Sequence, residues 1–183
     1  SSDLSITMRT HDGYLIPLMV TIGNHEVKGQ YGQTPKEAPF FYSLFAMPGP
    51  QGYNCLMAGN YLGFIILDSS HTHPIHGAQA AWLEETLQKM QSQQHRFAIY
   101  HVPAYPCVRL FRSPVSAAIR RHWVPLFEKY QLQVALENHD HAYKRTHPLI
   151  AGDISRDGVV YIGDGGWGVK VREPKKPSKS HYL

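Results

Sequence analysis

The sequence predicts a mixed α/β domain, and three observations support this. Apolar runs typical of strands alternate along the chain with segments of helical periodicity. The 183 residues, 43% of them hydrophobic and 17% charged, suit one globular domain with a substantial core. Several predicted strands end on histidine or asparagine, and the ends of strands are where ligand sites collect in α/β sheets.

Each element follows from local signals in the sequence. Residues 16–22 are an apolar run between a proline and a glycine, as expected of a buried strand. The pair Gly59-Asn60 separates two strand-like runs and predicts a hairpin. In order, the first half is predicted to hold a strand over 16–22, a long loop with a short strand near 40–45, strands over 53–58 and 61–67, and a helix over 78–90.

The second half begins with a strand that ends on a histidine. Ser113 followed by Pro114 predicts a helix start, because serine caps helices and proline is favoured at the first position. Pro125 predicts a break in that helix, which should end near Tyr130. The elements expected here are a strand over 97–100, a helix over 113–130, a strand over 132–136, and short strands over 148–150 and 159–162.

Composition excludes several classes of protein. The net charge of +4 and the pI near 9.0 are modest and come partly from residues 170–179, so we expect one folded domain over 1–169 and a solvated basic tail over 170–183. No basic stripe alternates with aromatic residues, so nucleic acid is not an expected partner. No apolar run is long enough to span a membrane, and we do not expect a membrane as a partner. Cys55 and Cys107 either pair or stay free.

Four nitrogen and oxygen donors follow predicted strands. They are Asn24, His101, His139 and His141, in a chain with 12 histidines. Imidazoles with an amide oxygen suit a transition metal such as Zn, Fe or Mn and suit Ca poorly. One alternative is a single ion that takes all four donors. Alternatively, because His139 and His141 are two residues apart, they reach two ions about 3.5–4 Å apart that clamp one phosphate.

The motifs around these donors resemble those of the calcineurin-like metallophosphoesterases, and within them the purple acid phosphatases. The resemblance rests on Gly23-Asn-His-Glu26, His101-Val-Pro-Ala-Tyr105, Asn138-His-Asp-His-Ala-Tyr143 and Ile162-Gly-Asp-Gly-Gly166, in that order. Asn138 stands where the family usually has glycine. The resemblance covers about residues 14–168.

The resemblance implies a four-layer αββα sandwich of the metallo-dependent phosphatase type, and phosphoester hydrolysis by water activated on two metal ions. Asn24, His101 and His139 would bind one ion and His141 the other, and the ions would be Fe, Zn or Mn. His25 would contact the phosphate or protonate the leaving oxygen, as an imidazole can; the alternative for His25 is a prop for its loop.

Two further groups of residues are weaker candidates. Tyr105, Arg109 and Arg112 follow the His101 motif on the loop that lines substrate in the resembling enzymes, and arginine grips phosphate with paired hydrogen bonds. Solvated surface positions are the alternative for both arginines. A second group, with no matching motif, is interpreted as a polar loop and consists of His71, His73 and His76.

The sequence departs from the family pattern before Gly23. The family has aspartate ligands there, one of which bridges both metals, and Asp3 and Asp12 lie in the wrong context. The chain, which opens on Ser1 without a methionine, therefore resembles the later two-thirds of a catalytic domain that lacks its first strands. Two dications without a bridging carboxylate would repel each other. We expect weak or single metal binding and little activity from this polypeptide alone.

The expected partners follow from the same reasoning. The substrate would be a small phosphoester or a phosphoprotein, and exposed sheet edges would favour a homo-oligomer. Two alternatives remain open: a phosphodiesterase or nucleotidase of the same superfamily, and a non-catalytic fragment or binding module that kept the fold. The resembling acid phosphatases are often secreted or periplasmic, which implies export of the whole protein.

Overall fold

The computed structural model describes most of the chain, in six stretches: residues 8–16, 18–46, 49, 51–166, 168–175 and 181–182. Its helices are η1 (Pro35–Glu37), α2 (Pro39–Leu44), α3 (Ala78–Lys89), η2 (Met90–Ser92), α4 (Pro114–His122) and α5 (Val124–Lys129). Its strands are β1 (Asn54–Ala58), β2 (Leu62–Ile66), β3 (His95–Tyr100), β4 (Val134–Glu137), β5 (Tyr143–Arg145), β6 (Leu149–Ile150), β7 (Asp153–Ile154) and β8 (Val160–Asp164).

Six strands form one mixed sheet in the order β1-β2-β3-β4-β8-β5. β2, β3, β4 and β8 are parallel neighbours, whereas β1 and β5 pair antiparallel at the two edges. β6 and β7 form a separate two-stranded ribbon. Because the four central strands are parallel, the loops that follow them leave from one edge of the sheet.

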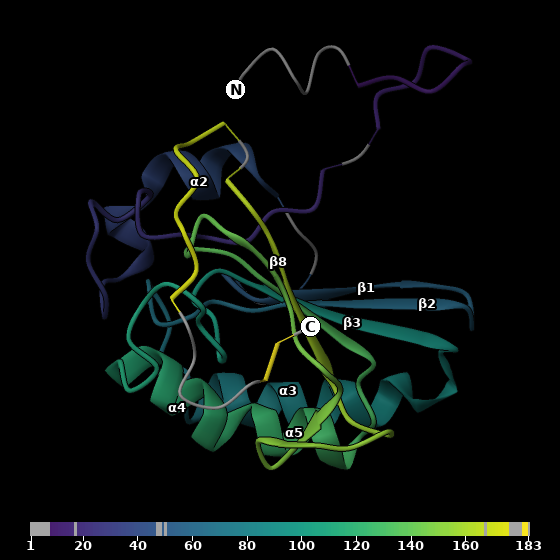
Figure 1. The fold of residues 1–183 in the computed structure, drawn as a ribbon. Helices are drawn as coiled ribbons and strands as arrows, with labels where there is room; N and C mark the ends of the chain where they lie inside the picture. Colours follow the sequence, from purple (N-terminus) through teal and green to yellow (C-terminus); the bar gives the residue numbers. More distant parts are fainter. Residues whose placement is uncertain are drawn as a thin grey trace.

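Helices α3, α4 and α5 cover one face of the sheet, as Figure 1 shows. The largest buried side chains between these layers include Trp123, Phe127 and Tyr100, and Trp123 donates its indole N–H to the carbonyl of Ile75 at 2.8 Å. On the other face, half-buried Phe64 and Phe97 stack with ring centroids 5.3 Å apart. No helix of the described residues covers that second face (Figure 1).

Most of the predicted elements are confirmed. The hairpin is β1 and β2, the helix over 78–90 is α3, and the mixed α/β class holds. Ser113 caps α4 by accepting the amide N–H of Ser116, and a second helix begins at Val124, so the predicted break near Pro125 is present. Cys55 and Cys107 are both free.

Two predicted strands are wrong. Residues 18–22 form no strand, because no neighbouring strand pairs with them; instead the Thr21 hydroxyl donates to the carbonyl of Leu67 at 2.8 Å. Pro17 lies outside the described residues. The segment near 40–45 is helix α2, where Pro39 occupies the first turn and starts the helix. The sequence did not predict β5 or β7.

None of the helices in the described part of the chain is long and apolar enough to cross a membrane. Parts of the predicted basic tail contact the domain: the Lys175 amide donates to Cys107 and the Tyr182 hydroxyl to Pro106, at 2.8 and 2.7 Å. The predicted boundary near residue 169 stays a prediction.

A buried carboxylate joins the ends of the central strands. Glu137, the last residue of β4, accepts the Tyr100 hydroxyl and the amide N–H of Ala104, each at 2.6 Å. Its other oxygen forms an ion pair with Lys144 of β5, whose ammonium also donates to the carbonyl of Tyr105. Glu137 and Lys144 are almost fully buried, so each charge depends on the other.

Lys144→Met should therefore leave an uncompensated buried carboxylate and lower the free energy of unfolding by about 3–5 kcal/mol. Urea unfolding measures the loss, with Lys89→Met at an exposed position of α3 as the matched control. Equal stability of the two variants would contradict the importance assigned to the ion pair.

Candidate metal centre

Three of the predicted donors meet at the carboxyl edge of the sheet. The Asn24 amide oxygen lies 2.8 Å from Nε2 of His101 and 3.1 Å from Nδ1 of His139. Those two ring nitrogens lie 2.9 Å from each other. The structure thus brings residues separated by as many as 115 positions in the sequence to one point.

The sheet and one flanking segment put the three donors there. His101 directly follows β3, and His139 lies two residues beyond β4, the parallel neighbour of β3. Asn24 arrives on the segment that Thr21 ties to the end of β2. Gly23 packs against the His101 ring so closely that a Cβ there would lie 3.1 Å from it. This close packing gives a physical reason for glycine in the Gly-Asn-His-Glu motif.

The loop that carries His139 and His141 has an unusual backbone. Both residues have positive φ, 66° and 56°, a left-handed conformation that side-chain-bearing residues seldom adopt. Between them, buried Asp140 accepts the backbone N–H groups of Cys107, Val108 and Arg109 at 2.6, 3.0 and 3.1 Å. Such backbone conformations persist only where the surroundings hold them, and they concentrate at functional sites.

Both central histidines are held neutral. Burial, and after it the nearby charges of His139 and His71, lower the pKa of His101 to about 2. Burial, followed by the charge of Arg109, lowers the pKa of His139 to about 3. Neutral imidazole is the form that binds metal, so the folded chain presents both rings ready for a cation.

The donor geometry fits a metal ion. Ligand atoms about 2.1 Å from one ion and at right angles lie about 3 Å from one another, which is the spacing of the three donor atoms here. No group of three or more His, Cys, Asp or Glu side chains able to hold a metal exists among the described residues. His101 and His139 supply two donors, and the Asn24 amide oxygen supplies the third.

His141 and His25 lie outside this triangle. The ring of His25 is exposed, and neither ring hydrogen-bonds to the three donors in the described structure. His141 is half-buried and its carbonyl accepts the amide N–H of Arg172 at 2.9 Å. The assignments of both residues stay predictions.

Two residues that were not predicted at the metal centre border it. His71, interpreted as part of a polar loop, is fully buried, with its ring centroid 5.3 Å from that of His101. Tyr31 stacks on His71 at 5.1 Å and places its hydroxyl 3.4 Å from Nε2 of His139. Neither lies in a motif or on a predicted element, so only the folded chain shows their position.

A cavity of about 660 Å³ opens beside His139. Tyr31, Arg109, Arg172 and Lys175 are among the residues that line it, which makes it a positively charged space next to the donors. Arg109 also lies with Nε 3.4 Å from the His139 carbonyl and 4.0 Å from the Asp140 carboxylate.

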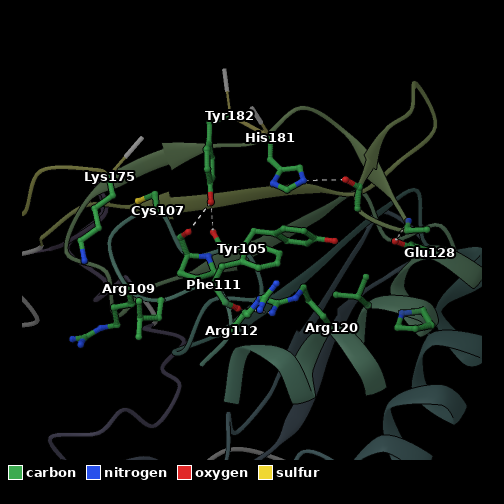
Figure 2. Close-up of a pocket in the computed structure, with 16 residues that line it drawn as sticks. Tyr105, Cys107, Arg109, Phe111, Arg112, Arg120, Glu128, Lys175, His181 and Tyr182 are labelled. Atoms are coloured by element: carbon green, nitrogen blue, oxygen red, sulfur yellow. Dashed lines mark hydrogen bonds between the residues drawn. The ribbon is translucent and has the colours of Figure 1, made fainter. Parts of the chain in front are cut away.

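The three residues predicted to bind substrate separate into two places. Arg109 borders the cavity beside His139, whereas Tyr105 and Arg112 do not line it. Tyr105 and Arg112 line a different cavity (Figure 2). Arg109 borders this second cavity as well. Their predicted role in substrate binding stays a prediction.

Comparison with known proteins shows what the chain is similar to. No protein-family model matches the chain. The chain is 29% identical over 162 residues to purple acid phosphatase 23 of Arabidopsis thaliana and 27% identical over 161 residues to purple acid phosphatase 15 of the same plant. Each match covers 82% of this chain, which spans about a third of the length of these relatives, 34% and 30%.

Solved structures agree on the fold. The purple acid phosphatase PPD1 from yellow lupin seeds superposes with a TM-score of 0.74 at 17% identity, over 91% of this chain and 34% of that one. The chain therefore shares the fold of this purple acid phosphatase structure. Together with the sequence matches, this makes the chain similar to purple acid phosphatases in both sequence and fold.

The Asp140 contacts generate a prediction about the loop. In Asp140→Asn, one of the two oxygens becomes an NH₂ group that faces backbone donors, so we expect a loss of about 2 kcal/mol in unfolding free energy. Hydrogen exchange of the Cys107, Val108 and Arg109 amides should quicken. Asp157→Asn, at an exposed turn, is the control. Unchanged exchange at those three amides would show that Asp140 does not hold the loop.

Proposed function

We propose that the protein hydrolyses phosphoesters with two bound transition-metal ions at this centre. The convergence of Asn24, His101 and His139 to within 3.1 Å of one another carries the proposal. Three neutral donors at one point are hard to explain as a structural hydrogen-bond network, because each neutral imidazole has only one N–H to donate. If they are metal ligands, the Asn24 oxygen and the two imidazole nitrogens each direct a lone pair at the same cation.

In this proposal Asn24, His101 and His139 hold the first ion and His141 helps to hold the second. His141 follows His139 on the same left-handed loop, which changes the chain direction between the two rings. Fe, Zn and Mn all accept such nitrogen and oxygen donors. When bound, a pair of such ions polarises phosphoryl oxygens and acidifies water.

The cations around the cavity would bind the phosphoryl group. Arg109 is anchored through its own amide to Asp140, so its guanidinium is held beside His139. Arg172 and Lys175 add positive charge from the chain that follows β8, and the Tyr31 hydroxyl offers a neutral donor. Fixed donors of this kind stabilise a phosphate and the negative charge that grows on it during transfer.

His25 would donate a proton to the leaving oxygen. It neighbours the ligand Asn24 and its ring is exposed, so a bound ester is able to approach it. A positioned imidazole serves both as hydrogen-bond donor to phosphate and as general acid.

We further propose that the 183-residue chain alone binds metal weakly and has low activity. The donors that converge are neutral, and no cluster with several carboxylates lies among the described residues. Neutral ligands offset none of the repulsion between two neighbouring cations.

The metal proposal is tested by titrating the chain with Co²⁺ and recording its visible absorption. We expect binding that His139→Ala and His101→Ala weaken by at least the ~10–100-fold that loss of a supporting residue alone costs at metal sites. His76→Ala, which removes an exposed histidine elsewhere, should leave the titration unchanged. Equal Co²⁺ affinity in all three variants would refute the assigned ligands.

Activity separates the remaining alternatives. Hydrolysis of p-nitrophenyl phosphate, with little turnover of bis-p-nitrophenyl phosphate, supports a monoesterase, and the reverse preference supports a diesterase. Metal binding without turnover of either ester, in a protein that includes the regions its relatives have and this chain does not, would favour a binding module.

A further inference from the structure

A second cavity, of about 820 Å³, lies away from the three donors. It is bounded by the loop 105–112, by α4 and α5, by the turn at Ala151 and Gly152, and by His181 and Tyr182. Figure 2 shows Arg112 and Arg120 on one side of it and His181 and Tyr182 on the other. Its size is that of small-molecule sites, which are commonly about 300–1,000 Å³.

This cavity is distinct from the metal centre. Asn24, His101 and His139 do not line it, whereas His139 lines the smaller cavity. The two cavities share Arg109, Leu110 and Lys175, so the loop after Pro106 forms a wall between them.

The wall chemistry combines apolar surface with positive charge. Tyr105, Phe111 and Val124 supply apolar surface, and four cationic side chains face one carboxylate, Glu128. Glu128 is engaged, because it accepts the amide N–H of Ala151 at 2.8 Å.

The arginines differ in what they already bind. Arg120 lies 3.8 Å above the Phe111 ring and donates to the carbonyls of Ala104 and Phe111, so its geometry is fixed. Arg112 is exposed and makes no hydrogen bond or ion pair within the described part of the chain. Arg112 is therefore a charge available to a ligand.

Tyr105 supplies the second unused group. Its side chain is 2% exposed, yet its hydroxyl has no hydrogen-bond partner among the described residues. Burial, and then the nearby charge of Glu128, raises the pKa of Tyr105 to about 12, so the hydroxyl keeps its proton. Because Tyr105 lines the cavity, a polar group of a ligand there can accept a hydrogen bond from this hydroxyl.

We propose that this cavity binds a small organic anion, with its apolar body between Tyr105 and Phe111 and its anionic group on Arg112. The Tyr105 hydroxyl donates to an oxygen of the same ligand. The anionic group is a carboxylate or a phosphoryl group, since a guanidinium pairs with either. The site does not depend on bound metal or on the proposed hydrolysis.

Calorimetric titration of the 183-residue chain tests the proposal, with three probes: 1-naphthylphosphonate, 1-naphthoate and inorganic phosphate. Both naphthyl compounds should bind about tenfold or more tightly than phosphate, because they bury apolar area that phosphate lacks. The tighter of the two identifies the preferred anionic group. Inorganic phosphate binding as tightly as both would overturn the apolar part of the site.

Variants of the cavity residues show whether the naphthyl probes bind in this cavity. Arg112→Gln should weaken the naphthyl probes about tenfold, and Tyr105→Phe about fivefold, from loss of a charged and a neutral hydrogen bond. Arg121→Gln, at an exposed neighbouring position of α4, is the control. Tyr105→Phe should unfold at the same temperature as the parent, because the hydroxyl it removes makes no hydrogen bond within the described residues.

His139→Ala separates this site from the metal centre. Unchanged affinity of the naphthyl probes in this variant supports the proposal. Affinity lost in His139→Ala but kept in Arg112→Gln and Tyr105→Phe would place the probes at the metal centre and refute it.

Discussion

The site depends on one buried carboxylate. Glu137 ends β4, and its two oxygens bind the hydroxyl of Tyr100 at the end of β3, the backbone after His101, and the ammonium of Lys144 on β5. A buried ion pair adds little net stability, because desolvation offsets the attraction between its charges. What it provides is position: the ends of two strands and the loop between them move as one unit, and the ligands leave from those ends.

Acidic and neutral groups have separate tasks in this region. Glu137 and Asp140 are both buried and turned toward structure, the first to strand ends and the second to three amides of the loop after His101. His139 lies between them and points the other way, to Asn24 and His101. In this motif Glu137, Asn138 and Asp140 thus hold the strand ends and the loop, whereas His139 faces the site.

Local signals predicted much of this fold. The Gly59-Asn60 turn, the Ser113 cap and the apolar period of α3 all appear as expected, because each is determined by residues near in sequence. The strand expected over 16–22 is absent where described, since pairing needs a partner that local pattern cannot supply. The short strand near residue 40 is a helix, because Pro39 favours a first helical turn.

The candidate site, like the fold, was predicted in part from local sequence and decided in part by tertiary contacts. The sequence by itself determined that His101 and His139 follow strands, and it marked Asn24, in the Gly-Asn-His-Glu motif, as a further candidate for the same transition-metal centre. Only the tertiary structure decided that these three converge, that His71 and Tyr31 border them, and that the predicted substrate loop separates two cavities. The reason is that local periodicity predicts where a strand such as β3 or β4 ends. Distances between side chains depend instead on the parallel register of β3 with β4. They also depend on loops held by buried carboxylates that accept hydrogen bonds from residues far away in the sequence.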